Sequence, residues 1–333
     1  MYTKFYGLKE KPFEITPDPK YLYLSESHKE ALAYLTYAVR ERKGFTVVTG
    51  EVGTGKTTLV QTLLSKLDGA ARTAYLFNPM MGSTDFLYYI CQDLGLRSQK
   101  KSKGQYLSQL HKFLLACYSR NEKVVLIIDE AHKLDPKLLE EVRLLTNLET
   151  AKSKLLQVIL IGQPELDEIL EDPQFRQLKQ RVSLRYHIVP LDKENTKKYI
   201  QRRLRIAGGI DHNIFTPKAL NKIYRYAKGI PRLINIICDN ALLTGYSSDQ
   251  KIIGQRVIDE VVSNLGGLGP QKRQKRFLLF KVFPLVVLGG LGFIVLAFLL
   301  NKKSGIAAGI EPFKNGILDF FQEMFRKLLK GVF

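Results

Sequence analysis

The stretch Gly50-Glu51-Val52-Gly53-Thr54-Gly55-Lys56-Thr57 matches the phosphate-binding pattern G-x-x-x-x-G-K-[ST] without a gap. It follows an apolar run typical of a β-strand, 45–49, and precedes a helix-like run, 57–66. Glycines let successive backbone N–H groups converge on an anion, and a helix N-terminus adds the positive end of its dipole. We therefore expect this stretch and the adjoining Thr58 to bind nucleotide phosphates, with Lys56 at the β- and γ-phosphates and Thr57 on Mg²⁺. A chance match in a glycine-rich turn is the alternative, which the strand and helix on either side disfavour.

An acidic pair follows a second apolar run. Val124 to Ile128 are all apolar, and the run has the length of a strand that is buried on both faces. Asp129, at the carboxyl end of this strand, can join the Mg²⁺ shell, and Glu130 can polarise a water molecule for attack on the γ-phosphate. An acidic pair after a strand is usually only a solvated turn, but its combination with the phosphate loop favours an ATP-hydrolysing site.

The composition narrows the class of protein. With 333 residues, the chain is long enough for two domains and a substantial core. Its 51 basic and 32 acidic residues give a net charge of +19, which indicates an anionic partner: nucleic acid, phosphate or anionic lipid. Cys91, Cys117 and Cys238 are odd in number and far apart, so we expect free, mostly buried thiols in a reducing compartment.

Strand and helix patterns alternate through the first part of the chain. The opening, 1–44, is rich in aromatic residues and proline, so we expect extended chain up to a helix whose start Ser27 and Glu30 mark as a capping box. Strands are expected near 45–49, 72–77, 124–128, 155–161 and 182–189, and helices near 57–67, 84–94, 104–119, 135–149 and 173–180. This alternation predicts an α/β domain, 1–190, with a parallel sheet flanked by helices on both faces.

Beyond Pro190 the pattern becomes helical. Amphipathic segments at 192–206, 216–227, 231–246 and 254–264 predict a small helical domain, 191–265. A glycine-rich break then opens a basic linker, 266–276. We expect 277–300 to be a transmembrane helix, because 282–300 holds 19 residues without a charged or strongly polar side chain, enough to span a bilayer core. A buried core helix is the alternative.

The last residues, 301–333, have an amphipathic pattern. Phe313, Ile317, Phe321, Met324 and Leu328 recur at spacings of three or four, with charged residues between them. Such a helix is suited to lying in the membrane interface, and packing on a partner protein is the alternative. Basic residues are concentrated before the predicted span, which places residues 1–270 in the cytoplasm and the tail outside, unless a re-entrant hairpin returns it.

Motifs spread along the chain carry a family resemblance. They are Phe5-Tyr6-Gly7-Leu8, Thr16-Pro17-Asp18-Pro19, Ser27-His28, Gly162-Gln163-Pro164-Glu165-Leu166, Tyr199-Ile200, Arg203-Leu204 and Gly229-Ile230-Pro231-Arg232-Leu233-Ile234-Asn235. Through them, from Phe5 to about Leu265, the chain resembles the AAA+ ATPases of the general secretion pathway protein A, or ExeA-like, family. The resemblance implies a P-loop AAA+ fold in which the helical domain is a lid.

The resemblance also implies roles for single residues. Gln163 matches the sensor-1 position, which contacts the γ-phosphate or the attacking water, and Arg232 matches sensor 2 on the lid. In such proteins an arginine before the last strand reaches into the neighbouring subunit's nucleotide; Arg181 is the first choice and Arg176 the second. A surface arginine paired with an acidic residue is the alternative for either. The segment 12–15 either walls the adenine or packs in the core.

These features favour an ATP hydrolase, an AAA+ ATPase that uses ATP and Mg²⁺ and forms a homo-oligomeric ring or filament. We expect a single-pass protein of the bacterial inner membrane, with its ATPase domain cytoplasmic. It would contact membrane lipid and components of an envelope secretion, pilus or polysaccharide-export system. The alternative is a DNA-associated AAA+ ATPase of the transposition-regulator type, which the net charge would suit but which has no need of a span. Intact Lys56, Asp129 and Glu130 disfavour a scaffold that binds nucleotide without hydrolysing it.

Overall fold

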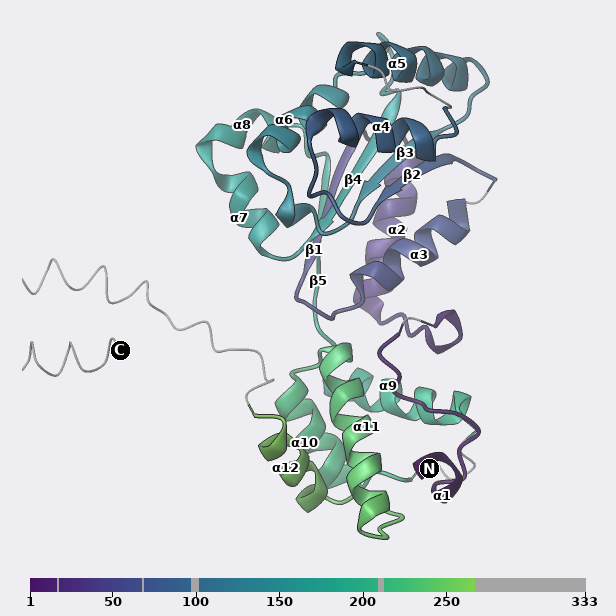
Figure 1. Ribbon diagram of the computed structural model, residues 1–333, viewed down its shortest axis with the longest axis vertical. Coiled ribbons are helices and arrows are strands. Elements are labelled where there is room, and N and C mark those ends of the chain that lie inside the picture. Colours follow the sequence, from purple (N-terminus) through teal and green to yellow (C-terminus); the bar gives the residue numbers. More distant parts are fainter. Residues whose placement is uncertain (17, 68, 97–101, 209–212, 267–333) are drawn as a thin grey trace, which may run out of the picture. The chain divides into compact units, whose positions relative to one another are not determined.

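The structure, a computed structural model, describes residues 1–266 apart from 17, 68, 97–101 and 209–212. It contains a parallel sheet of five strands in the order β2-β3-β4-β1-β5 (Figure 1). The strands are β1 (Phe45–Gly50), β2 (Arg72–Leu76), β3 (Val124–Ile128), β4 (Leu156–Gly162) and β5 (Leu184–Ile188). The predicted α/β fold with a parallel sheet is confirmed.

The helices that accompany the sheet fall mostly where the periodicity placed them. They are α2 (Glu26–Arg40), α3 (Lys56–Leu67), α4 (Ser83–Asp93), α5 (Lys103–Ser119), α6 (Pro136–Leu145), α7 (Glu165–Glu171) and α8 (Arg176–Lys179), with 3₁₀ turns at Ala131–Lys133 and Pro173–Phe175. Helix α7 was not predicted, because seven residues are too few for a clear helical period. Helix α6 ends four residues before the predicted 149, and the chain there turns back through a bridge between Glu149 and Lys154.

Side chains of single strands alternate between the two faces of the sheet. Val125 and Ile127 of β3 pack with α2 and α3, whereas Leu126 packs on the other face with α4, α5 and α6 (Figure 1). This alternation follows from the pleat, which sends successive side chains to opposite faces. The thiols of Cys91 and Cys117 are buried in the second of these cores, and neither forms a disulfide, as expected.

The start of α2 differs from the prediction. Its N-cap is Ser25, whose hydroxyl oxygen accepts a hydrogen bond from the backbone N–H of His28 at 3.4 Å. The predicted capping box of Ser27 and Glu30 is therefore wrong. The Ser27 hydroxyl instead accepts a hydrogen bond from the backbone N–H of Val189, just beyond β5, at 3.2 Å. Two serines with similar local patterns are thus distinguished by contacts made far along the chain.

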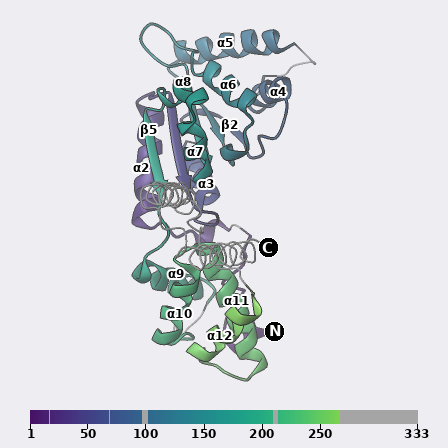
Figure 2. The ribbon, with the colours of Figure 1, turned by 90° about the vertical axis from the view of Figure 1, so that its left-hand side faces the viewer.

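Four more helices form a further hydrophobic core, separate from the two on the faces of the sheet: α9 (Lys193–Ile206), α10 (Pro217–Ala227), α11 (Pro231–Ser247) and α12 (Gln255–Asn264). The N-terminal segment lies beside these helices (Figure 2). Its Tyr2, Leu8 and Phe13 are buried in the same core. It holds the short helix α1 (Tyr2–Phe5) and a 3₁₀ turn, Pro19–Tyr21, where extended chain was predicted. Short stretches such as these are formed by their tertiary contacts rather than by a local pattern.

The predicted transmembrane helix, 277–300, and tail, 301–333, lie outside the described residues, as does the predicted linker apart from Gly266. In the part of the chain that is described, no helix combines the length and the apolar character that crossing a membrane requires. The described residues all belong to one compact unit, 1–270. Its division into two domains at residue 190 stays a prediction.

Candidate nucleotide-binding site

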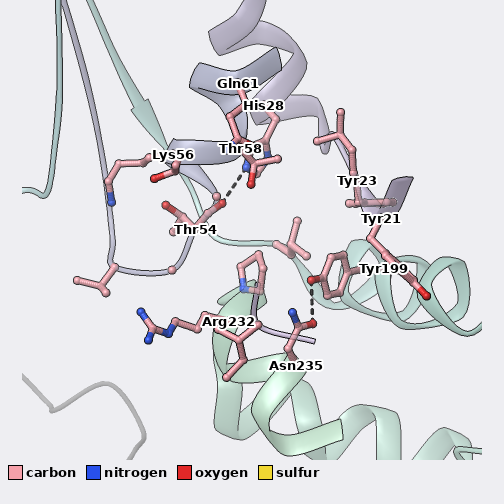
Figure 3. A pocket seen from close by; sticks show the side chains of 18 of the residues that line it. Tyr21, Tyr23, His28, Thr54, Lys56, Thr58, Gln61, Tyr199, Arg232 and Asn235 are labelled. Atoms are coloured by element: carbon pink, nitrogen blue, oxygen red, sulfur yellow. Dashed lines mark hydrogen bonds between the residues drawn. The ribbon is translucent and has the colours of Figure 1, made fainter. Parts of the chain in front are cut away.

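A cavity of about 390 Å³ lies at the carboxyl ends of three neighbouring strands. The phosphate loop follows β1, Glu130 follows β3 and Gln163 follows β4, which pairs with both of the others. Parallel strands end at the same edge of a sheet, so these residues meet although they are far apart in sequence. The segment before α2 and the start of α11 complete the walls (Figure 3).

Two glycines of the phosphate loop occupy conformations that other residues rarely adopt. The φ angles of Gly53 and Gly55 are +79° and +99°. A Cβ on Gly53 would lie 2.7 Å from the Cβ of Arg232, and one on Gly55 would lie 3.1 Å from Nε2 of His28. The Gly53 carbonyl also accepts a hydrogen bond from the backbone N–H of Arg232 at 3.3 Å. The loop is therefore packed closely between α2 and α11, which leaves room only for glycine.

Lys56, the first residue of α3, is buried and keeps its amine at the loop. Its Nζ donates hydrogen bonds to the carbonyl oxygens of Gly50 at 2.8 Å and Glu51 at 3.0 Å. Burial lowers the pKa of the Lys56 amine, while the charges of Glu130 and Asp129 oppose that change. A cation held in this way supplies a fixed positive charge beside the cavity.

Asp129 receives hydrogen bonds from two neighbouring elements. The hydroxyl of Thr57 donates to Asp129 Oδ2 at 3.1 Å, and the hydroxyl of Tyr75 on β2 donates to the same oxygen at 3.2 Å. Asp129 is buried, and its Oδ1 accepts a hydrogen bond from the Glu130 backbone N–H at 2.8 Å. A hydroxyl and a carboxylate in contact are oxygen ligands of the type that Mg²⁺ prefers. The sequence paired Thr57 with Asp129 but missed Tyr75, which has no motif of its own.

Glu130 has an unusual backbone and an ionised carboxyl. Its φ and ψ angles are 52° and 33°, in the left-handed region, so its side chain leaves the strand in a different direction from that of Asp129. Burial alone raises the pKa of this carboxyl, but Lys133, His132 and Lys56 outweigh burial and leave the pKa lowered. Lys133 Nζ lies 3.0 Å and His132 Nε2 lies 3.7 Å from the Glu130 carboxylate.

His132 connects the ends of β3 and β4. Its Nδ1 accepts a hydrogen bond from the Gln163 backbone N–H at 3.3 Å, so in the neutral ring Nε2 carries the proton on the side of Glu130. Burial lowers the pKa of His132, which favours that neutral form. This residue was not singled out from the sequence, because its role depends on a contact across neighbouring strands.

The sequence-predicted site residues do not all reach the cavity. Of the predicted residues, those that line the cavity are Val52, Gly53, Thr54, Gly55, Lys56, Thr57, Thr58, Glu130, Gln163 and Arg232. Gly50, Glu51 and Asp129 lie behind this lining, in the loop and beneath it. Arg181 and Arg176 are not part of the lining; Arg181 Nη1 donates to the hydroxyl of Thr146 at 3.2 Å. Within one described chain, neither arginine reaches the phosphate loop.

The rest of the cavity wall is formed by residues that the sequence did not assign to the site. They are Thr16, Asp18, Tyr21, Leu22, Tyr23, His28, Gln61, Leu191, Tyr199, Arg203, Pro231 and Asn235. The Tyr199 hydroxyl donates to Asn235 Oδ1 at 2.8 Å (Figure 3). The Arg203 guanidinium lies 4.9 Å from the ring centre of Tyr21. In the segment 12–15, Phe13 is buried in the helical core, as the packing alternative had it, whereas Ile15 lines the cavity; that this segment walls the adenine stays a prediction.

The residues fit Mg²⁺–ATP. A cavity of about 390 Å³ is within the usual range for small-ligand sites. The loop presents its close-packed glycines, the amine of Lys56 and the start of α3 at one end, as a phosphate group requires. Thr57 and Asp129 supply oxygen ligands beside it. Tyrosine rings and Ile15 at the other end suit a planar base.

Comparisons with known proteins agree with this geometry. Residues 39–170 match the AAA domain family. The solved structure of the Aeropyrum pernix ORC2 protein in its ADPNP–ADP complexes is 16% identical, with a TM-score of 0.58 over 80% of this chain and 74% of that one. The structure of Drosophila ORC bound to DNA is 17% identical, with a TM-score of 0.61 over 98% and 84%. At such low identities these two likenesses concern the fold alone.

A curated relative is far more similar in sequence. General secretion pathway protein A of Aeromonas hydrophila is 48% identical over 248 residues, which are 74% of this chain and 45% of that protein. The matched part thus amounts to less than half the length of the relative. The family resemblance inferred from the motifs is confirmed. The chain therefore contains an AAA domain and, over the residues that align, is a homologue of general secretion pathway protein A.

Proposed function

We propose that this chain is an ATP hydrolase that binds Mg²⁺–ATP in the cavity between the phosphate loop and α11. The observation that carries this function is the convergence of Lys56, Glu130 and Gln163 on one cavity from three neighbouring strands. A structural ion pair would not need a glycine-rich loop, a buried lysine and an ionised carboxylate around the same space. The AAA domain match supports the same activity.

Binding and metal coordination fall to the loop and to β3. The loop N–H groups and Lys56 bind the β- and γ-phosphates, and Arg232 approaches them from α11. Thr57 and Asp129 are the proposed Mg²⁺ ligands, and Tyr75 orients the Asp129 carboxylate through its hydrogen bond. When bound, Mg²⁺ supplies charge neutralisation on the phosphate oxygens.

Glu130 is the proposed general base. Its ionised carboxylate accepts the proton of a water molecule whose oxygen bonds to the γ-phosphorus as the bond to the β,γ-bridging oxygen breaks. The lowered pKa keeps the carboxylate charged at neutral pH, so it is ready to accept that proton. Gln163 is the proposed sensor residue, with its amide directed at the attacking water or the γ-phosphate.

Arg181 is proposed to act on the site of a neighbouring subunit, with Arg176 as the second choice. Its distance from the cavity of its own chain agrees with this role, because a head-to-tail contact joins two different surfaces and builds a ring or a filament. Arg181 is half-buried, and its Nη1 donates to the hydroxyl of the buried Thr146 at 3.2 Å, so this contact orients the side chain that is proposed to reach the neighbour.

Mixing two inactive variants tests the arginine in trans. Arg181→Ala and Lys56→Ala subunits should each be inactive alone, and their mixture should regain part of the wild-type rate, because each supplies the group that the other lacks. Phosphate release at several mixing ratios measures this recovery. The same mixture with Arg176→Ala in place of Arg181→Ala shows which arginine is needed. No recovery at any ratio, in samples shown to form mixed oligomers, would rule out Arg181.

We further propose that the ATPase serves an envelope secretion, pilus or polysaccharide-export system from the inner membrane. Support comes from the relative in Aeromonas hydrophila, which is named for the general secretion pathway, and from the apolar run 277–300 with basic residues before it. The amphipathic tail, 301–333, is proposed to lie in the membrane interface or on a protein partner of that system.

Partitioning between lipid and DNA separates this role from the DNA-associated alternative. The full chain, purified in detergent, should enter vesicles and resist extraction at high salt, because burial of 277–300 does not depend on charge. A chain that ends at 276 should lose this association and keep its ATPase activity. A full chain that leaves the vesicles in salt but binds duplex DNA, with affinity falling steeply as salt rises, would favour the DNA role instead.

A further inference from the structure

His28 is a buried imidazole that links α2 to the phosphate loop. It is 5% exposed and lies in the first turn of α2. Its Nε2 is 2.8 Å from the carbonyl oxygen of Thr54, and its Nδ1 is 2.7 Å from the hydroxyl of Ser25 (Figure 3). The ring also packs against Gly55, where an added Cβ would lie 3.1 Å from Nε2. No role in nucleotide binding has yet been given to this residue.

The two contacts determine which ring nitrogen carries the proton. A carbonyl oxygen can only accept, so Nε2 must be the donor to Thr54. In the neutral ring Nδ1 then accepts from the Ser25 hydroxyl, which also serves as the N-cap of α2. Burial lowers the pKa of His28, more than the Thr54 carbonyl raises it, so the neutral ring is favoured. Ser25, His28 and Thr54 thus form one chain of hydrogen bonds from the start of α2 to the loop.

The contact with Thr54 fixes the direction of one peptide of the loop. In a trans peptide the C=O and the following N–H point in opposite directions, and the described chain has no cis peptide. A donor that holds the Thr54 carbonyl therefore directs the N–H of Gly55 away from His28. With φ values of +79° and +99° on either side of Thr54, the loop glycines allow other peptide orientations unless a contact excludes them.

Other carbonyl groups of the loop are held as well. Lys56 Nζ donates to the carbonyls of Gly50 and Glu51, and the backbone N–H of Arg232 donates to that of Gly53. Phosphate binding requires loop N–H groups, not carbonyls, on the ligand side. We propose that His28 is a positioning residue for the phosphate loop: its Nε2–H holds the Thr54–Gly55 peptide in the orientation that binds nucleotide phosphates. This role rests on the proposed binding of Mg²⁺–ATP.

Three substitutions in the full chain test the role. Gln places an amide N–H near the position of Nε2 and can still reach Thr54, whereas Asn is too short and Leu has no donor. We expect His28→Leu and His28→Asn to raise the Kd and KM for Mg²⁺–ATP on the order of 10-fold, because the Thr54 carbonyl loses its buried partner. The Kd and KM of His28→Gln should stay near the wild-type values. In all three variants kcat should change less than KM, because the oriented loop binds the nucleotide equally in the ground state and in the transition state.

The measurements are titration with a fluorescent ATP analogue, steady-state phosphate release and thermal unfolding without nucleotide. His111→Gln, on the exposed side of α5, is the matched control and should change none of them. Equal Kd values for the Gln and Asn variants would overturn the role of His28, and this comparison decides even where the Leu variant fails to fold. If the His28 variants lower thermal stability but keep the wild-type Kd and KM, His28 has a purely structural role and the proposed positioning role is wrong.

A failure of this role can be told apart from a failure of the proposed function. Wild-type protein that does not bind Mg²⁺–ATP would contradict the ATPase itself. Wild-type protein that binds and loses binding on Lys56→Ala, while His28→Asn binds as tightly as wild type, would contradict only the role of His28.

Discussion

Lys56→Ala should abolish measurable binding of Mg²⁺–ATP, with a loss of about 100-fold or more in affinity. Lys56 is the buried cation of the phosphate loop, and its amine lies 2.8 Å from the loop carbonyl oxygen of Gly50. Charge-assisted hydrogen bonds to phosphate oxygens are about twice as strong as neutral ones, and no water molecule replaces the charge. Equilibrium titration with a fluorescent ATP analogue measures the loss.

The matched control for this change is Lys66→Ala. Lys66 belongs to the same helix, α3, but lies exposed in its last turn. The Lys66→Ala variant should bind Mg²⁺–ATP like the wild type. This result would exclude a general loss of positive charge from α3 as the cause of the binding loss in Lys56→Ala. Thermal unfolding of Lys56→Ala should remain cooperative, because Asp129 keeps its hydrogen bonds from Thr57 and Tyr75 and Glu130 keeps its ion pair with Lys133. Wild-type affinity in Lys56→Ala would contradict the assignment of the phosphate loop.

Glu130→Gln should keep nucleotide binding and reduce turnover about 100- to 10,000-fold. The amide has nearly the shape of the carboxylate but cannot accept the proton of the attacking water. Binding should survive because the loop, Thr57 and Asp129 are unchanged, and the Glu130 backbone N–H can still donate to Asp129. Steady-state phosphate release and a parallel binding titration measure the two quantities on one preparation.

Glu165→Gln is the control for the charge change. Glu165 lies at the start of α7, and its charge acts on both Lys56 and His132, but it is exposed and does not line the cavity. Its loss should leave turnover near the wild-type rate. Equal rates for wild type and Glu130→Gln would remove Glu130 from the role of general base. Loss of binding in Glu130→Gln would instead mean that its carboxylate is needed for the structure of the site.

The parts of the fold that local patterns specify could be predicted from the sequence. The strand Val124–Ile128 is buried throughout, and its apolar run alone located it. The rule that parallel strands end at one edge then placed Asp129 and Glu130 beside the phosphate loop, whereas Gln163 was assigned to the site through the family resemblance. Helix α7 was missed because its seven residues give almost two turns and no clear period.

The contacts that shape the site from a distance could not be predicted in this way. His28 reaches Thr54 across 26 positions of the sequence, and Tyr75 reaches Asp129 across 54. Tyr23 donates to Asn195 of α9 across 172 positions. A histidine or tyrosine on an apolar helix face or strand is most often a core residue, and only the tertiary arrangement shows which one meets the loop. Arg203 was noticed as part of a family motif, but its contact with the carbonyl of Pro12 was visible only in the structure.

Phosphate release from Mg²⁺–ATP by the wild-type full chain tests most directly whether this site hydrolyses ATP. The rate should depend on Mg²⁺, should rise per subunit with protein concentration if a neighbour supplies Arg181, and should exceed that of Lys56→Ala purified in parallel. A wild-type preparation that binds Mg²⁺–ATP and yet releases phosphate no faster than Lys56→Ala, at every protein concentration, would contradict the ATPase.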